Sequence, residues 1–298
     1  MIHLRTLEIP LQWDETELGD IMENTVTILG ARGSMSVGGT AYLRYGGATT
    51  CVLLRLFGQI ILLDAGTGLM NMPPDLLDAP SLPLLLTHAH ADHLLGLPLC
   101  PYVMRRGARL EIYAARRGGL DAETQIRRLL SPPLWPVGPD RLPADIRFHD
   151  LPAELHLDAD GRAASPNAGV IRVLSMEGAH PNGVSILRLE GNGKSVVFMT
   201  DCAITDALRP AALKFARDCS LLLCDGQYSD AEWSARVGFG HNSWSVAQKF
   251  AREGRARQVR IVHHDPFHTD AVLDAAAEEL ERLCPGCAFA REGEAILL

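Results

Sequence analysis

Short apolar runs separated by glycine-rich or polar segments recur along the whole chain. These runs lie at 25–30, 51–56, 59–64, 84–87, 110–113, 171–175, 184–189, 195–200, 220–224 and 258–262. Apolar runs of this length that end in turn residues are typical of buried strands. Phe57-Gly58 and the Gly-Asn-Gly segment at 191–193 each separate two neighbouring runs, so they predict hairpins.

Stretches with helical character alternate with the strands in the later part of the chain. They cover 122–130, 207–218, 244–253 and 269–283. Asp121, Ser243 and Thr269 occupy N-cap positions, where a short polar side chain can accept a hydrogen bond from the first helical turn. Pro210 fits the first turn of the second helix. A short strand at 294–298 is expected to close the chain.

One apolar run, 84–87, ends in a dense cluster of potential metal ligands. His88, His90, Asp92 and His93 fill four of six consecutive positions. Because side chains alternate along an extended segment, His88 and His90 can point to the same side. The two later residues can then face a second point nearby, so one loop can supply two ligands to each of two metal ions. This density disfavours the alternative, in which the histidines only cap a helix.

Composition narrows the class of protein and of partner. The 298 residues are 47% hydrophobic, which suffices for the core of one large domain or two small ones. The formal net charge of -8 argues against a broad basic surface for nucleic acid, because binding phosphates needs clustered lysine and arginine. Arginines gather locally at 105–128, and solvated helix faces are the simpler explanation for them.

The location of the protein is predicted from its N-terminal region and its cysteines. The first 20 residues include Asp14, Glu15, Glu17 and Asp20 and no long apolar run preceded by basic residues, so no secretory signal is expected. No stretch approaches the ~18 apolar residues that a membrane span needs. Seven scattered cysteines suit a reducing cytoplasm, so we predict a cytoplasmic protein. Cys284 and Cys287 have redox or zinc spacing but no second pair, and a turn with two incidental thiols is the favoured interpretation.

The segment from His88 to His93 resembles the His-x-His-x-Asp-His signature of the metallo-β-lactamase fold superfamily. Residues 30–34 (Gly-Ala-Arg-Gly-Ser) and 44–49 (Arg-Tyr-Gly-Gly-Ala-Thr) also resemble segments of its ribonuclease Z-like and phosphodiesterase-like branch, as does the Asp-Ala-Gly-Thr-Gly segment at 64–68. The resemblance implies an α/β fold, a four-layered αβ/βα sandwich in which two mixed sheets pack face to face with helices outside. It further implies that residues 1–298 form a single hydrolase domain with the site at the rim between the sheets.

The resemblance also implies a ligand set for two metal ions. The first ion would take His88, His90 and His180, the second Asp92, His93 and a C-terminal histidine, and Asp201 would bridge the two. Two histidines compete for the last position, and His264 ranks ahead of His263. In ribonuclease Z-like chains a strand-end threonine precedes this ligand and an aspartate follows six residues later, where this chain has Asp270. Asp64 is expected to orient a ligand histidine rather than to bind metal.

A general acid is implied outside the ligand set. The Gly-His-Asn-Ser segment at 240–243 is similar to a His-Ser-Thr-type motif at a helix start in ribonuclease Z-like enzymes. In those enzymes the histidine protonates the leaving group and an acidic residue orients it. His241 and Asp225 would have these catalytic roles here, and the Asn-Ser pair is a small departure from the motif. The alternative is that His241 is simply the residue at a helix N-terminus.

Hydrolysis is the chemistry that such a site favours. Two adjacent divalent cations lower the pKa of a bridging water enough to give a hydroxide nucleophile near neutral pH. Histidine and carboxylate ligands favour zinc, while manganese or iron would also fit. The preferred prediction is a dinuclear metal-dependent phosphodiesterase that acts on a small or cyclic phosphodiester.

Other functions rank below this one. A tRNA 3′-processing endoribonuclease usually has a Gly/Pro-rich arm, and none is visible between His90 and His180 or before Asp201. Thioester, lactone or β-lactam hydrolysis on the same metals is a third possibility, and a metal-stabilised binding module without activity is a fourth. The expected partner is therefore a small molecule rather than nucleic acid or a membrane, and a homodimer is expected by analogy only.

Overall fold

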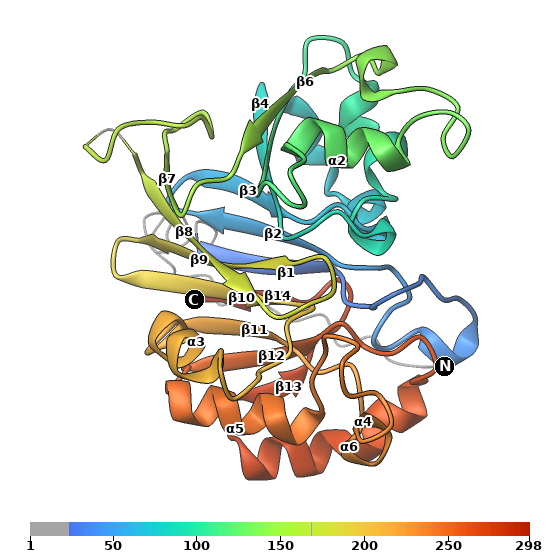
Figure 1. Cartoon of the computed structure of the whole chain (residues 1–298), viewed down its shortest axis with the longest axis vertical. Helices are drawn as coiled ribbons and strands as arrows, with labels where there is room; N and C mark the ends of the chain where they lie inside the picture. Colours follow the sequence, from blue (N-terminus) through green and yellow to red (C-terminus); the bar gives the residue numbers. More distant parts are fainter. Residues whose placement is uncertain (1–23, 168) are drawn as a thin grey trace, which may run out of the picture.

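The computed structural model describes residues 24–167 and 169–298, in which two seven-stranded sheets pack face to face (Figure 1). The first sheet has the strand order β14-β1-β2-β3-β4-β5-β6 and the second has the order β13-β12-β11-β10-β9-β8-β7. The first contains β1 (Asn24–Gly30), β2 (Cys51–Leu56), β3 (Gln59–Leu63), β4 (Ser81–Leu86), β5 (Arg109–Ala114), β6 (Asp145–Asp150) and β14 (Ala295–Leu297). The second contains β7 (Glu154–Leu157), β8 (Ile171–Gly178), β9 (Val184–Gly191), β10 (Lys194–Met199), β11 (Leu221–Asp225), β12 (Gln258–Val262) and β13 (Cys287–Phe289).

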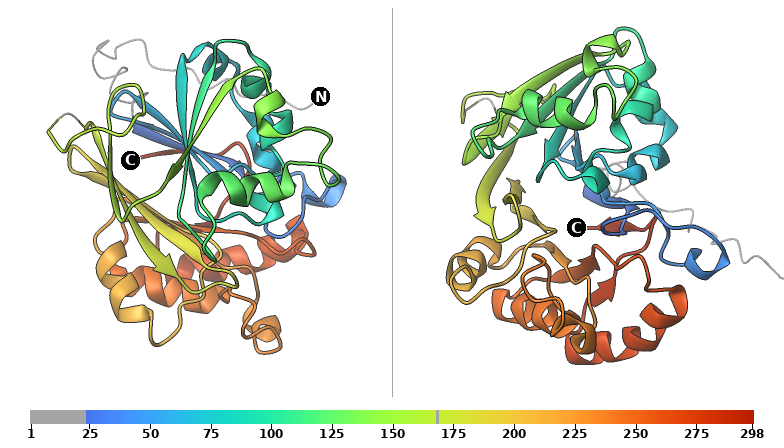
Figure 2. Two further views of the ribbon diagram at one scale, coloured as in Figure 1. Left: turned by 45° about the horizontal axis from the view of Figure 1, so that its top comes forward. Right: turned by 45° about the vertical axis from the view of Figure 1, so that its right-hand side comes forward.

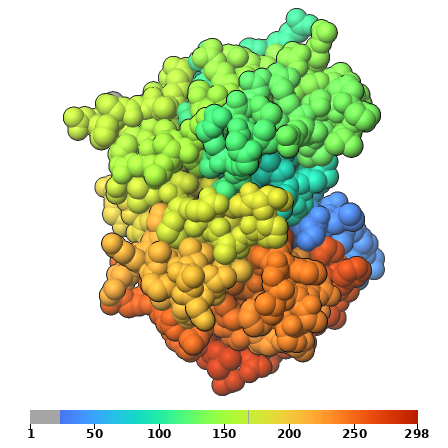
Figure 3. Space-filling model, in the orientation of Figure 1, coloured from blue at the N-terminus to red at the C-terminus, as the bar shows by residue number. Residues whose placement is uncertain are grey.

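Helices cover the outer faces of this sandwich (Figures 1 and 2). The helix α2 (Ala122–Leu129) lies over the first sheet, whereas α3 (Arg209–Ala216), α5 (Trp244–Gly254) and α6 (Asp270–Leu283) lie over the second, with the single turn α4 (Asp230–Trp233) near them. In the space-filling view, the part that contains α2 and the C-terminal helical part occupy opposite ends of the molecule (Figure 3). Two mixed sheets with helices outside confirm the predicted architecture.

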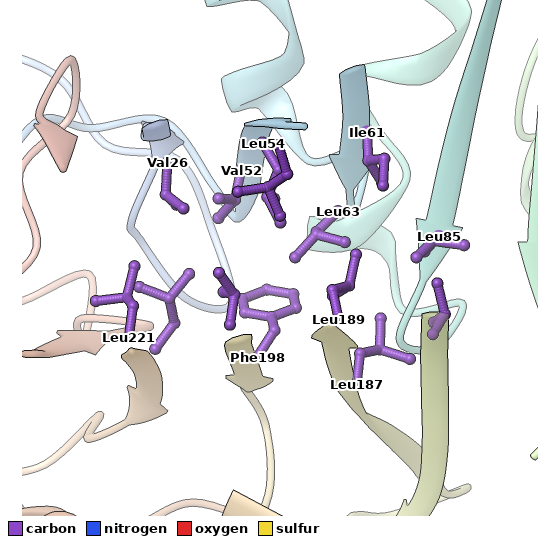
Figure 4. Packing of buried hydrophobic residues seen from close by; sticks show 14 of the residues in the cluster. Val26, Val52, Leu54, Ile61, Leu63, Leu85, Leu187, Leu189, Phe198 and Leu221 are labelled. Carbon is purple, nitrogen blue, oxygen red and sulfur yellow. The ribbon is translucent and has the colours of Figure 1, made fainter. Parts of the chain in front are cut away.

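Alternating apolar residues fill the space between the sheets. Val26 and Leu54 of the first sheet face Phe198 and Leu221 of the second, and all of them are buried (Figure 4). The period of two along each strand places every second side chain in this layer, because successive side chains of a strand point to opposite faces. The sandwich is therefore held together mainly by apolar burial between its two inner faces.

Phe198 is the largest of these side chains in the centre of the layer, and it is fully buried. We expect Phe198→Ala to lower the free energy of unfolding by about 3–5 kcal/mol, because it leaves a cavity that rigid sheets can fill only in part. Urea unfolding of the metal-free protein measures this loss. A loss below ~1 kcal/mol would mean that the two sheets close over the cavity.

Parallel strands bring several carboxyl ends to one edge of the sandwich. The strands β3 to β6 run parallel to one another, and so do β10 to β13. In parallel sheets the loops beyond the carboxyl ends gather at one edge, and ligands bind there. The polar segments after β4, β10, β11 and β12 consequently meet at the same rim.

Local details agree with most of the predicted elements. Asp121 accepts a hydrogen bond from the backbone N–H of Thr124 and Ser243 accepts one from Val246, as N-cap residues do. Thr269 precedes α6, but its side chain makes no capping hydrogen bond, so that part of the prediction was wrong. Short elements such as α4 and β13 were not predicted, because four and three residues are too few to show a period. No helix in the described residues has the length and apolar character needed to cross a membrane.

Candidate metal centre

Three histidine rings converge at the rim from two different loops. His88 and His90 come from the loop after β4, and His180 comes from the turn between β8 and β9. The Nδ1 atom of His90 lies 2.9 Å from Nε2 of His88 and 3.2 Å from Nε2 of His180. A zinc-sized ion with tetrahedral Zn–N bonds of about 2.0–2.1 Å holds its ligand nitrogens about 3.3 Å apart. The three nitrogens therefore have the spacing of metal ligands.

A second group of ligand atoms lies beside the first. It consists of one atom each from Asp92, His93, Asp201 and His263, all within 4.8 Å of one another and all buried. Nε2 of His263 lies 3.0 Å from Oδ1 of Asp201 and 3.2 Å from Oδ2 of Asp92. Nε2 of His93 is buried and has no hydrogen-bond partner in the described part of the chain. A buried ring nitrogen without a partner costs stability unless something else binds it, and a cation between these carboxylates would do so.

The Asp201 carboxylate lies between the two groups. Its Oδ1 atom faces His93 and His263, at 3.3 and 3.0 Å from their Nε2 atoms. Its Oδ2 atom lies 3.7 Å from Nε2 of His88 and 3.8 Å from Nε2 of His180. One carboxylate thus presents one oxygen to each group, which is the placement expected of a bridging ligand.

The remaining nitrogens of these rings are held by the protein. Oδ2 of Asp64 lies 2.8 Å from Nδ1 of His93, and the same carboxylate accepts a hydrogen bond from the hydroxyl of Thr87. That hydroxyl lies 3.1 Å from Nδ1 of His88. Such partners fix the orientation and the tautomer of a ligand histidine, so Nε2 of His93 is left for the metal. Asp64 has the geometry of the orienting residue that the sequence predicted.

The electrostatics of the two groups also suit a cation. Burial, helped by the neighbouring rings of His241 and His90, lowers the pKa of His180 to about 4, so this ring is neutral at pH 7 with a lone pair to donate. Burial alone would lower the pKa of His263, but the carboxylates of Asp201 and Asp92 outweigh it and raise that pKa to about 10. Because the two carboxylates keep a proton on the buried ring of His263, they favour positive charge at this position. The residues present therefore fit divalent metal ions.

Unusual backbone conformations concentrate at this rim. Five residues there have positive φ without being glycine: Ser34, Asp64, Asn182, Asp201 and His263. Non-glycine residues adopt this region rarely and at a cost of order 1–3 kcal/mol each. Strain of this kind persists where the surrounding structure requires a particular side-chain direction, which is typical of a functional site.

The sequence predicted His264 rather than His263 as the C-terminal ligand, and this preference was wrong. His263 lies in the second ligand group, whereas Nε2 of His264 lies 2.9 Å from the carbonyl oxygen of Ala290. The strand β12 ends at Val262, and the positive φ of His263, 64°, turns its side chain toward the rim. Its neighbour points the other way, into the protein. Gly33 is needed beside it, because a Cβ there would lie 2.2 Å from Nδ1 of His263.

The two adjacent histidines can be told apart by substitution. We expect His263→Ala to weaken binding of the second metal ion by more than about 100-fold, the upper end of what loss of an outer-shell partner costs. We expect His264→Ala to leave metal content unchanged and to lower the free energy of unfolding by about 1–3 kcal/mol, because the buried carbonyl of Ala290 loses its partner. Competition with a chelator measures the first effect and urea unfolding the second. The reverse pattern would restore His264 as the ligand.

A buried acid and histidine lie next to the ligand groups. Oδ2 of Asp225, at the end of β11, lies 2.8 Å from Nδ1 of His241. The same carboxylate accepts hydrogen bonds from the backbone N–H groups of Asp201 and Asn242. The ring of His241 stacks on that of His263, with centroids 4.9 Å apart. Asp225 therefore fixes the orientation of His241 and leaves its Nε2 atom available.

Some residues that hold this arrangement were not predicted from the sequence. The side-chain oxygen of Asn242 accepts a hydrogen bond from the backbone of Ile204, and its amide donates to the carbonyl of Cys202, so it ties the loop after β10 to His241. The backbone N–H of Ser34 donates to Asp92. Two features of the sequence could have pointed to these residues: Ser34 ends the Gly-Ala-Arg-Gly-Ser segment, and Asn242 directly follows His241. Their hydrogen bonds could not be predicted because the partners lie 38 and 58 residues away.

Two clefts open on the ligand groups from different sides. The cleft that we call the arginine cleft has a volume of 530 Å³ and includes His88, His90, Arg117, Arg128 and Asn182 in its lining. The one that we call the tryptophan cleft has a volume of 610 Å³ and includes His180, His241, Ile204, Trp233 and Val237. The rim can therefore be reached through two clefts.

Comparison with known proteins agrees with this geometry. A family model described as the beta-lactamase superfamily domain matches residues 59–264. Ribonuclease Z of Treponema pallidum is 22% identical over 286 residues, which cover 82% of this chain and 89% of the relative. The crystal structure of the short form of human tRNase Z has a TM-score of 0.63 and 21% identity, covering 91% of this chain and 98% of that one. A diphosphatase of the PhnP family has a TM-score of 0.62 and 18% identity, with 92% and 97% covered. The structural likeness confirms the metallo-β-lactamase fold.

Proposed function

The chain belongs to the β-lactamase superfamily and has the fold of its metal-dependent hydrolases, and on this premise we propose that it is a phosphodiesterase. The observation that carries the proposal is the Asp225–His241 pair beside two adjacent ligand groups. A phosphodiester needs stabilisation of charge on its phosphoryl oxygens and a proton for its leaving oxygen. This site offers groups for both tasks. We also propose that the chain acts as one hydrolase domain, since both sheets supply residues to the site.

The proposed ligands divide as the geometry groups them. His88, His90 and His180 would hold one ion, and Asp92, His93 and His263 would hold the other, with Asp201 shared. Two divalent cations, zinc in our proposal, would polarise the phosphoryl group and lower the pKa of a bound water. Asp64 and Thr87 keep two of the rings oriented for this purpose.

His241 is proposed as the general acid. Asp225 accepts a hydrogen bond from Nδ1, so Nε2 is the nitrogen from which a transferable proton can leave. With both nitrogens protonated, His241 donates the Nε2 proton to the departing oxygen and becomes neutral, while the leaving group departs as an alcohol. Asp225 takes no part in this proton transfer. It orients the ring of His241, as buried carboxylates do beside catalytic histidines.

The substrate has two candidate classes. Similarity to proteins named ribonuclease Z, over 82% of the chain in one case, supports a polynucleotide. The formal charge of -8 supports a small phosphodiester instead, because a long polyanion would be repelled by most of the surface. We favour the small substrate. The seven cysteines, all free and buried, support a reducing compartment such as the cytoplasm.

One activity screen tests the proposal. Metal-loaded protein is assayed with bis-(p-nitrophenyl) phosphate, cyclic nucleotides, a precursor tRNA and a thioester, with His88→Ala as the blank. We expect hydrolysis of at least one small phosphodiester and none by the blank. A protein that binds two metal ions and cleaves only the tRNA would establish the second candidate, and one that cleaves only the thioester would refute phosphodiester chemistry.

A further inference from the structure

The two clefts give the substrate a direction at the proposed site. His241 lines the tryptophan cleft and not the arginine cleft. A phosphodiester carries two organic groups, and the one whose oxygen is protonated by His241 must lie on the side of that histidine. The leaving group therefore belongs in the tryptophan cleft, whose walls include Trp233, Ile204 and Val237. The group that stays on phosphorus is directed to the arginine cleft.

The arginine cleft differs in charge from the rest of the protein. Its lining includes two arginines and no aspartate or glutamate from the described part of the chain. The whole sequence, by contrast, has 36 acidic residues against 28 basic ones. An isolated positive wall on an acidic protein attracts anions locally, because charges in a cleft act on a ligand at short range with little solvent between.

The two arginines of this cleft are not equivalent. Both terminal nitrogens of Arg117 have protein partners, since Nη1 donates to the Glu177 carboxylate and Nη2 donates to the Ser185 hydroxyl, while its Nε is buried and has no partner among the described residues. Arg128 lies on the exposed face of α2 and forms no ion pair with an acidic residue within the described residues. Its neighbour Arg127 faces another cleft and is paired with Glu123 and Asp140. Arg128 is thus the cation that remains for a ligand.

Leucine side chains contribute to the wall of the arginine cleft. Leu120, Leu129 and Leu134 line it, and Leu134 is 67% exposed. Asn182 stands at the inner end, where its amide lies 3.4 Å from Nε2 of His90. A ligand that fills this cleft can contact the leucine side chains as well as Asn182 and Arg128.

We propose that the arginine cleft is a subsite for the retained group of the substrate, and that it selects an apolar chain with one terminal anion, a carboxylate or a phosphate, which Arg128 binds. The inference rests on the proposed phosphodiesterase function. One unpaired arginine matches one anion, since a guanidinium binds a carboxylate or a phosphate through two parallel hydrogen bonds. A substrate of this kind is a small diester, not a polynucleotide with a phosphate at every residue.

The test uses p-nitrophenyl phosphodiesters that differ only at the end of the second ester chain. The chain ends in a carboxylate, a phosphate monoester or a primary amide, the last having nearly the shape of the carboxylate without its charge. We expect metal-loaded protein to prefer one or both anionic esters over the amide by about tenfold in kcat/KM, which is typical of one partly exposed charged hydrogen-bonding pair. The preferred anion identifies the source of the charge.

Variants of α2 supply matched controls. Arg128→Gln should reduce the ratio between the anionic and amide esters to about one, and Arg128→Glu should reverse it. Arg127→Gln removes the same net charge one residue away and should retain the ratio. Equal losses in Arg127→Gln and Arg128→Gln would overturn the subsite, since the preference would then come from net charge alone. A wild-type ratio of one would overturn the subsite while leaving the phosphodiesterase proposal intact, and so would failure to hydrolyse the three esters by a protein that cleaves another phosphodiester of the screen. Failure to hydrolyse the three esters and every phosphodiester of the screen would refute both proposals.

Discussion

Asp201→Ala is expected to have the largest effect of any single substitution, a fall in kcat/KM of at least about 10³-fold for any phosphodiester that the protein hydrolyses. The reason is that its two carboxylate oxygens face different ligand groups, at 3.0 Å from Nε2 of His263 on one side and 3.7 Å from Nε2 of His88 on the other. Loss of this side chain removes a ligand from both groups at once. Metal content after dialysis and steady-state kinetics measure the two parts of the effect.

A matched control separates this loss from misfolding. Asp145 is an exposed aspartate of β6 that contacts only arginine side chains, and Asp145→Ala should retain both metal ions and full activity. The unfolding curve of Asp201→Ala should be compared with that of the wild type in the metal-free state, because bound metal by itself stabilises the folded protein. An Asp201→Ala variant that keeps two ions and its activity would show that the carboxylate does not bridge.

His241→Ala is expected to lower kcat by about 10²–10⁴-fold, the range that general acid catalysis contributes, without loss of metal. The effect should be large for an ester with an alkyl leaving group, which cannot depart without a proton. It should be much smaller for p-nitrophenyl esters, because p-nitrophenolate is stable as an anion and needs little protonation. The ratio of the two losses, measured on one preparation, reports the acid role directly.

A purely structural role for His241 predicts a different pattern. The ring stacks on His263, so its removal could disturb the second ligand group and lower the rates of both esters alike. His149→Ala offers a control. His149 of β6 pairs with Glu111 of β5, and neither residue belongs to the ligand groups. Equal losses for both leaving groups, together with loss of metal, would contradict the general acid assignment.

The local part of the site could be predicted from the sequence for a simple physical reason. His88, His90, Asp92 and His93 lie within six residues, so the geometry of one loop decides where they point. The strands could be predicted too, because alternation of apolar side chains records which face of a strand is buried. Short elements such as α4 and β13 escaped this reasoning.

What the sequence determined by itself was the identity of the ligand types, the strand that delivers them and the two-sheet architecture implied by resemblance. Only the tertiary structure decided between His263 and His264, because the choice depends on a single backbone angle at the end of β12 and on the space that Gly33 leaves. It also placed His241 in the lining of one cleft and Arg128 in the lining of the other. Those properties arise where loops from both sheets meet, and contacts between residues more than a hundred positions apart leave no local pattern in the chain.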